Sequence, residues 1–277
     1  MTTSDAAETQ TWPFYTPPTA VDIRGYQTFY RRAGNGPMVV YIHGMGLTAK
    51  WLPFHAALAE RVDLLAPELP GFGGSLLPDW LRSVDDAVTH LDDLLASLGV
   101  EQLHLAGNSL GGWVAARCAV VYPRRIRSLS LVSPLGMRVP GHPLYDVFRM
   151  TPEEADDVLL NGTASEYGPE LDNGEHVEAT VRSYREITAA ARMAWNPRYD
   201  VRFERLLTRV TAPALVIAAQ DDHVVPREHC ERYADLLPNG QLRVIEGATA
   251  PTAHLALLQE PRGLAEMIAT FVANQEG

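Results

Sequence analysis

The stretch of sequence that decides the fold is Leu103-His104-Leu105-Ala106-Gly107-Asn108-Ser109-Leu110-Gly111-Gly112. Its apolar first half indicates a buried strand, and the residues from Leu110 to Val121 are typical of a helix. A G-x-S-x-G pattern between a strand and a helix places Ser109 in a sharp, strained turn that exposes its hydroxyl. The glycines two positions to either side let neighbouring segments pass closely. The pattern predicts a nucleophilic serine; the alternative is a glycine-rich turn without a catalytic role.

Strands and helices alternate on both sides of this turn, which predicts an α/β fold with a mostly parallel central sheet and helices on both of its faces. The clearest helix begins with a capping box of Ser83 and Asp86 and ends before Gly99. The expected strands are Val21–Arg24, Gln27–Arg32, Met38–His43, Val62–Pro67, Gln102–Ala106, Ser128–Val132, Ala214–Ala219 and Leu242–Ile245. The expected helices of this core are Trp51–Arg61, Ser83–Leu98, Leu110–Val121, Arg227–Leu237 and Pro261–Val272.

The alternation stops between about Leu135 and Val210, where the sequence is helical and aromatic without a strand pattern. Thr151-Pro152-Glu153-Glu154 is typical of a helix start, and Glu178–Ala194 indicates a longer helix. The simplest interpretation is a helical cap over residues 135–210, inserted after the sixth strand into a core that consists of residues 21–134 and 211–277. The polar N-terminus, which contains prolines, predicts a flexible arm over residues 1–20.

Composition excludes several classes of function. The chain of 277 residues has a net charge of −11, which argues against a nucleic-acid surface and against docking on anionic lipid. There is no signal peptide pattern and no apolar run of membrane-spanning length. The two cysteines, Cys118 and Cys230, do not suggest a disulfide framework, and no metal-binding motif is present. We therefore expect a cytoplasmic enzyme without cofactor or metal, either a monomer or a homodimer, acting on a small molecule.

The chain resembles the α/β-hydrolase superfamily from about Val21 onward, and is most similar to capped bacterial hydrolases of the esterase, lactonase and carbon–carbon hydrolase group. The resemblance rests on the serine turn and on three further motifs. These are His43-Gly44-Met45-Gly46 after an apolar strand, Pro70-Gly71-Phe72-Gly73-Gly74-Ser75, and Ala219-Gln220-Asp221-Asp222-His223-Val224-Val225-Pro226. The second motif has Glu68 where the family usually has Asp two residues before the proline, and we interpret it as structural.

The resemblance implies roles for particular residues. The backbone N–H groups of Met45 and Leu110 would form the oxyanion hole, with Gly44 beside the substrate. In the family pattern G-x-x-D-x-x-x-P, the aspartate is the acid of the catalytic triad. The spacing to Pro226 selects Asp222 for that role rather than Asp221, although a slip of one residue is the alternative.

The general base must be chosen among nine histidines. The superfamily order is serine, acid, histidine, which leaves His223, His229 and His254. His223 adjoins the acid, and His229 is expected on the surface of the helix after Pro226. His254 follows a strand in a loop, where the family places its base, so we predict it as the triad histidine.

The predicted function is hydrolysis of a carboxylic ester or lactone of a small, largely apolar substrate through an acyl-enzyme. The alternatives are a carbon–carbon hydrolase of the meta-cleavage type, an acyltransferase, and a non-catalytic ligand-binding protein on the same fold. The carbon–carbon hydrolases tend to have serine after His-Gly and tryptophan after the base, where this chain has Met45 and Leu255. The apolar residues proposed to line the pocket from the cap are Tyr145, Phe148, Met150, Tyr184, Met193 and Trp195, with Phe148 and Trp195 singled out as substrate contacts.

Overall fold

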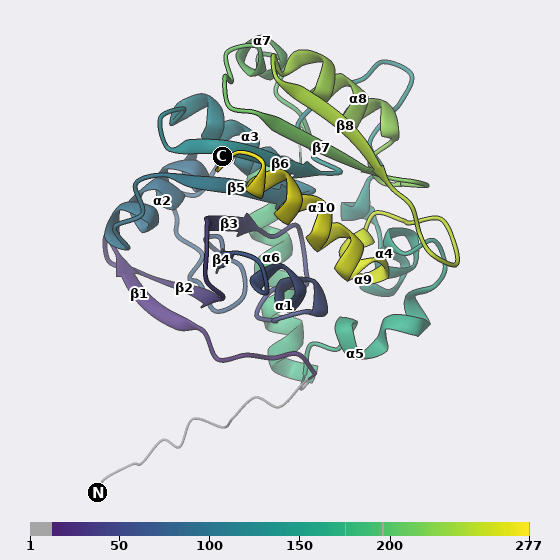
Figure 1. Ribbon diagram of the computed structural model, residues 1–277. Helices are drawn as coiled ribbons and strands as arrows, with labels where there is room; N and C mark the ends of the chain where they lie inside the picture. The colour runs from purple at the N-terminus through teal and green to yellow at the C-terminus, as the bar shows by residue number, and fades with distance from the viewer. Residues whose placement is uncertain (1–12, 175, 196, 277) are drawn as a thin grey trace, which may run out of the picture.

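A twisted sheet of eight strands forms the centre of the computed structural model, which describes residues 13–174, 176–195 and 197–276 (Figure 1). The strand order is β1-β2-β4-β3-β5-β6-β7-β8. The hairpin of β1 and β2 is antiparallel, β2 also runs antiparallel to β4, and every later neighbour is parallel, as predicted. The strands are β1 (Thr19–Ile23), β2 (Tyr26–Ala33), β3 (Met38–Ile42), β4 (Asp63–Pro67), β5 (Leu103–Asn108), β6 (Ile126–Val132), β7 (Ala214–Ala219) and β8 (Gly240–Ile245).

The central strands bury both of their faces, because alternate side chains point to opposite sides of a strand. In β3, Val40 and Ile42 belong to one hydrophobic core and Val39 and Tyr41 to the other. The first core packs against α2 (Val84–Ser97), α3 (Leu110–Val121), α7 (Phe203–Leu207) and α8 (Arg227–Leu236). The second packs against α1 (Pro53–Ala59), α9 (Ala256–Gln259) and α10 (Pro261–Ala273).

The segment between β6 and β7 forms the predicted cap region. It begins with the 3₁₀ turn η1 (Val147–Arg149), and the capping box of Thr151 and Glu154 starts α4 (Pro152–Leu159) as expected. There follow η2 (Ala164–Tyr167), α5 (Gly168–Leu171) and the long α6 (His176–Ala194). In Figure 1 the helices α4, α5 and α6 lie on the side of the molecule away from α7 and α8. The last helix of the predicted insertion, α7, packs against α3 and α8 of the core.

The cap is attached to the core through polar contacts of α6. Glu186 accepts hydrogen bonds from the Thr48 hydroxyl and, at 2.8 Å, from the backbone N–H of Gly73. Arg185 donates to the carbonyl oxygen of Gly73, and Arg192 donates to that of Pro78 at 3.0 Å. These contacts hold α6 against two loops of the core.

The predicted N-terminal arm covers residues 1–20. Residues 1–12 of it lie outside the described residues. From Pro13 onward the chain lies against the core rather than apart from it. The backbone N–H of Trp51 donates to the carbonyl oxygen of Phe14 at 2.8 Å, and Arg31 donates to that of Thr16 at 2.7 Å. The first strand, β1, then begins at Thr19.

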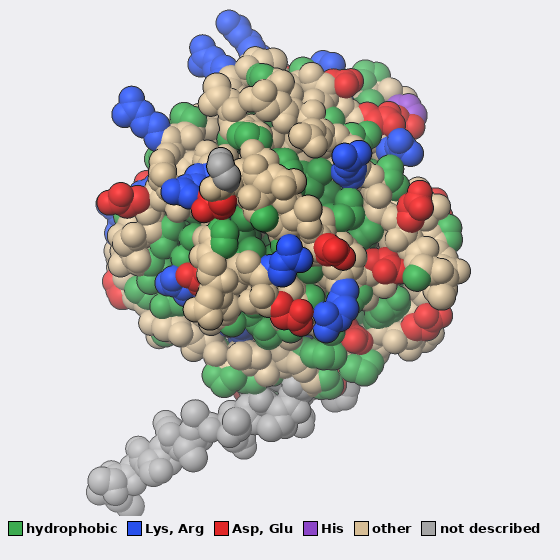
Figure 2. All heavy atoms as spheres, viewed as in Figure 1, with side chains coloured by type: hydrophobic (Ala, Val, Ile, Leu, Met, Phe, Trp, Pro, Cys, Tyr) green, Lys and Arg blue, Asp and Glu red, His purple; other side chains and the backbone are tan. Residues whose placement is uncertain are grey.

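Charged side chains of both signs are mixed over the face of the molecule that Figure 2 shows, with apolar side chains between them. That face therefore presents no continuous basic surface of the kind that binds nucleic acid. Within the described part of the chain, none of the helices combines the length and apolar character that a transmembrane span requires.

Candidate active site

Ser109 occupies the turn between β5 and α3. Its backbone has φ +53° and ψ −120°, a conformation that residues other than glycine rarely adopt. Side chains on the flanking glycines would not fit, because a Cβ on Gly107 would lie 2.4 Å from the carbonyl oxygen of Gly111. A Cβ on Gly111 would lie 2.2 Å from the carbonyl oxygen of Ile42. The sequence pattern and the strained turn therefore have one cause, which is close packing of β3, β5 and α3.

The loop after β3 lies beside this turn, since Ile42 pairs with Gly107 across the two parallel strands. A Cβ on Gly44 would lie 2.9 Å from Asn108 Nδ2 and 3.2 Å from Ser109 Cβ, so a larger residue at that position would crowd the serine. Met45 lines the same cavity as Ser109. Of the two predicted oxyanion donors, Met45 therefore lies in the loop beside Ser109, and Leu110 is the first residue of α3, directly after Ser109.

His43 fixes the conformation of that loop. The N–H of Leu69 donates to His43 Nε2 at 3.0 Å, so Nδ1 carries the ring proton and donates to the carbonyl oxygen of Gly44 at 2.7 Å. Burial lowers the pKa of His43, which keeps the ring neutral. With both ring nitrogens engaged in hydrogen bonds to the backbone, His43 has a structural role.

The turn from Pro70 to Ser75 is also structural. Glu68 forms a buried ion pair with Arg31 at 2.5 Å and accepts a hydrogen bond of 2.6 Å from the N–H of Gly74. Gly73 has φ +56°, and a Cβ there would lie 2.2 Å from the carboxylate of Glu68. The glutamate that replaces the usual aspartate therefore occupies the space that this glycine leaves open.

Asp222 and His254 form a buried pair. Nδ1 of His254 lies 3.1 Å from Oδ1 and 2.9 Å from Oδ2 of Asp222, and their side chains are 2% and 1% exposed. The backbone N–H groups of Val224 and Val225 donate to Oδ1 at 2.9 and 2.8 Å. Burial alone would raise the pKa of Asp222, but the attraction of His254 and these hydrogen bonds outweigh it and lower that pKa. The aspartate is held as an ionised acceptor.

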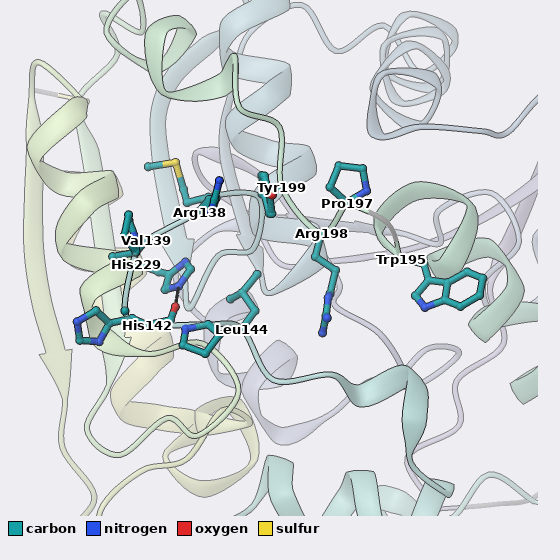
Figure 3. Close-up of a pocket in the computed structure, with 13 residues that line it drawn as sticks. Arg138, Val139, His142, Leu144, Trp195, Pro197, Arg198, Tyr199 and His229 are labelled. Carbon is teal, nitrogen blue, oxygen red and sulfur yellow. Dashed lines mark hydrogen bonds between the residues drawn. The ribbon is translucent and has the colours of Figure 1, made fainter.

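The neighbouring candidates lie elsewhere. Asp221 is about half exposed and lies 3.2 Å from His223, itself exposed, and its carboxylate accepts from Asn161 of the cap at 3.1 Å. His229 was expected on the surface, and this was wrong: it is 1% exposed, and its Nε2 donates to the carbonyl oxygen of His142 at 2.7 Å. The loop of residues 137–144 covers the helix face that carries it, as Figure 3 shows. Of the three histidines after the acid, only His254 contacts Asp222.

Ser109 and His254 open into a common cavity of about 200 Å³ between the core and the cap. Because pockets for drug-sized ligands usually measure about 300–1,000 Å³, this cavity suits a small substrate. Much of the wall is apolar, as expected for the cap. The apolar residues in it include Leu135, Tyr145, Val147, Phe148, Met150, Leu159, Ile187 and Leu255.

The cap residues predicted to line the pocket divide into two groups. Tyr145, Phe148 and Met150 line the cavity, whereas Met193 is buried in the core and Tyr184 is 71% exposed. Trp195 was singled out as a substrate contact, and it does not line the cavity: it is 60% exposed at the end of α6. Trp195 instead borders a separate hollow of about 360 Å³ beside residues 137–144 (Figure 3). The last turn of α6 is oriented so that Trp195 points to this hollow and not into the cavity that contains Ser109.

Four charged residues among the described residues of the cavity wall were not anticipated from the sequence. Asp156 comes from α4, Arg182 and Glu186 come from α6, and Arg198 lies in the segment after α6. Nothing in the sequence distinguishes them from charges that face solvent, because α4 carries three further acidic residues and α6 carries acidic and basic residues along its length. No group of three or more His, Cys, Asp or Glu side chains within the described ranges is arranged to hold a metal ion.

A family model described as the alpha/beta hydrolase family matches residues 39–267. The 2-hydroxy-6-oxo-6-(2'-aminophenyl)hexa-2,4-dienoic acid hydrolase of Metapseudomonas resinovorans is 27% identical, over 92% of this chain and 90% of that protein. The pimeloyl-[acyl-carrier protein] methyl ester esterase of Aeromonas hydrophila is 28% identical, over 87% of this chain and 97% of that protein. Both are similar along nearly their whole length.

Solved structures show the same fold. A meta-cleavage product hydrolase from Pseudomonas fluorescens superimposes with a TM-score of 0.77 at 23% identity, covering 94% of this chain and 98% of that one. A thermophilic esterase from Thermogutta terrifontis gives 0.72 at 23% identity, covering 95% and 100%. The chain therefore belongs to the alpha/beta hydrolase family, and with a serine at the strained turn it is a serine hydrolase of that fold.

Proposed function

We propose that this protein hydrolyses a carboxylic ester or lactone of a small, largely apolar substrate through an acyl-enzyme. The observation that carries the proposal is the buried Asp222–His254 pair, with His254 and Ser109 facing one small, mainly apolar cavity. An acyl group of modest size fits such a cavity, and the triad chemistry requires only residues that are present.

The proposed mechanism assigns one task to each group. His254 takes the proton of Ser109 as the hydroxyl attacks the substrate carbonyl, and later returns it to the leaving alcohol. Asp222 holds the imidazole in the tautomer that is protonated at Nδ1 and stabilises its charged form. The backbone N–H groups of Met45 and Leu110 bind the oxyanion. A water molecule, activated by His254, then attacks the acyl-enzyme and releases the acid.

A carbon–carbon hydrolase is the second candidate. Its support is the similarity to a dienoic acid hydrolase, together with Arg182 in the cavity wall, because a guanidinium suits the carboxylate of an acidic substrate. Met45 and Leu255 stand where that group tends to have serine and tryptophan, which favours the ester. The third candidate, an acyltransferase, would use the same acyl-enzyme with an alcohol in place of water.

A panel assayed side by side tests the proposal. It contains p-nitrophenyl esters from acetate to octanoate, several lactones and a 2-hydroxy-6-oxo-dienoic acid, with the Ser109→Ala variant as the blank. We expect the short esters or a lactone to give the highest kcat/KM. A higher kcat/KM on the dienoic acid would favour the carbon–carbon hydrolase, and acyl transfer to an added alcohol in preference to water would favour the acyltransferase. Failure of a fluorophosphonate probe to label Ser109 would indicate a non-catalytic protein.

A further inference from the structure

Asp156 places a carboxyl group in the wall of the cavity that contains Ser109 and His254. It projects from α4 of the cap and is half-buried. The side chain makes no hydrogen bond or ion pair with another side chain or backbone group among the residues that the structure describes. A half-buried carboxyl group is usually paired, because ionisation away from water is costly without a partner.

The other charged groups in the cavity wall have partners. Glu186 accepts from Thr48 and Gly73, and Arg182 donates to the carbonyl oxygen of Asn173. Burial lowers the pKa of Arg182 and raises the pKa of Glu186, and the attraction between these two side chains opposes both shifts. Arg198 forms an ion pair with Asp146 at 3.3 Å and donates to the carbonyl oxygen of Tyr145 at 3.2 Å. Among the described charged residues of the cavity wall, Asp156 is therefore the one without a hydrogen-bond or ion-pair partner.

Two charged residues act on Asp156 from outside the cavity wall. Glu153, on the same helix, repels a negative charge on Asp156, whereas Lys50 of the core attracts it. Lys50 is itself buried and donates to the carbonyl oxygen of Glu170, so its ammonium group is already engaged. Burial first, and then Glu153, raise the pKa of Asp156 to about 6, against the weaker effect of Lys50. When the carboxyl group of Asp156 is ionised, no hydrogen-bond donor among the described residues meets it on the side that faces the cavity.

We propose that Asp156 is a specificity-determining residue that accepts a hydrogen bond from a donor group on the substrate, an ammonium group best and a hydroxyl group second. This inference rests on the proposed function and narrows the substrate to an ester or lactone with an apolar body and a donor group away from the reacting carbonyl. Such a group supplies the partner that the carboxylate lacks, and charge-assisted hydrogen bonds of this kind are among the stronger ones in proteins.

Three small inhibitors of equal chain length test the proposal: hexylammonium, hexanol and hexanoate. Each competes with p-nitrophenyl acetate, which is short enough to leave the rest of the cavity free, at a mildly alkaline pH where Asp156 is ionised. We expect inhibition in the order hexylammonium, hexanol, hexanoate. The Asp156→Asn variant should weaken inhibition by hexylammonium about tenfold or more. The Asp156→Lys variant should reverse the order in favour of hexanoate.

Asp157→Asn is the matched control, because Asp157 is the next residue of α4, is exposed and lies outside the cavity wall. It should leave the order of the three inhibitors unchanged. Equal inhibition by the three compounds in the wild type, or an unchanged order in Asp156→Asn, would overturn the proposal. If the ester is not hydrolysed at all, the proposed function fails instead. The same inhibitors are then ranked by how far they slow fluorophosphonate labelling of Ser109, so the role of Asp156 is still tested.

Discussion

His254 Nδ1 lies between the two carboxylate oxygens of Asp222, although the residues are 32 positions apart in the chain. Asp222 follows β7 and His254 follows β8, and these neighbouring parallel strands end at the same edge of the sheet. Ser109 follows β5 at that edge, with β6 lying between β5 and β7. The carboxyl ends of the strands of an open α/β sheet are where such folds gather their sites. The sheet topology therefore assembles three residues from separate loops.

Replacing Asp222 by Asn should reduce kcat by about 10⁴, because the amide favours the wrong tautomer of His254. Asp221→Asn is the matched control, since that side chain is about half exposed and contacts His223 and Asn161 rather than His254. Steady-state kinetics on the best ester compare the two variants. A larger loss in Asp221→Asn would transfer the role of triad acid to the neighbouring residue.

Phe148→Ala should shift the preferred acyl chain of the p-nitrophenyl esters towards longer chains, because removing the ring enlarges the cavity beside Ser109. Trp195→Ala should leave that preference unchanged, since Trp195 is exposed and borders the separate hollow. Both variants should be labelled by a fluorophosphonate at nearly the wild-type rate. A chain-length preference that responds to Trp195 and not to Phe148 would contradict this placement of the cavity.

Stability should fall as the pH is lowered from about 6.5 to about 4, in part through His90. Its ring is buried, shares a hydrogen bond of 2.8 Å with Thr28, and has its pKa lowered from 6.5 to about 4, mainly by burial. In this window the unfolded chain takes up a proton that folded His90 does not, so acid favours unfolding. At 1.36 kcal/mol per pH unit the effect reaches about 3 kcal/mol at most.

Urea unfolding measured across this pH range tests the role of His90. The His90→Gln variant should show a smaller decrease in the free energy of unfolding on acidification than the wild type. Some decrease should persist, because burial also lowers the pKa of His55, to about 3. His142, whose side chain is 41% exposed, provides the control through His142→Gln. An identical pH dependence in wild type and His90→Gln would show that His90 contributes nothing to the acid sensitivity.

The sequence predicts those features that short-range sterics impose. Gly107 and Gly111 are required because backbone passes within van der Waals distance of them, so the strained serine turn is visible as a pattern. Ser83 accepts a hydrogen bond from the N–H of Asp86 at the start of α2, so the helix start is also local. The alternation of such strands and helices along the chain predicts the parallel sheet. The point where the alternation stops predicts the position of the cap.

Features that depend on how helices are oriented were not predictable. His229 is buried because a loop 87 residues earlier in the chain packs over α8, and no periodicity within the helix indicates that cover. Trp195 faces away from the cavity, and Asp156 faces into it, because of how the cap helices sit on the core. The pattern of a helix shows where its apolar residues lie but not which neighbour its polar residues meet.

The turnover of Ser109→Ala on the best ester of the panel is the most direct test of the proposed chemistry. Triad residues act as a unit, so the predicted loss in kcat is on the order of 10⁶, with thermal unfolding close to that of the wild type. In parallel, a fluorophosphonate should add once to the wild type, at Ser109, and not to the variant. If a folded Ser109→Ala protein retained more than a few per cent of the wild-type turnover, Ser109 would not be the nucleophile.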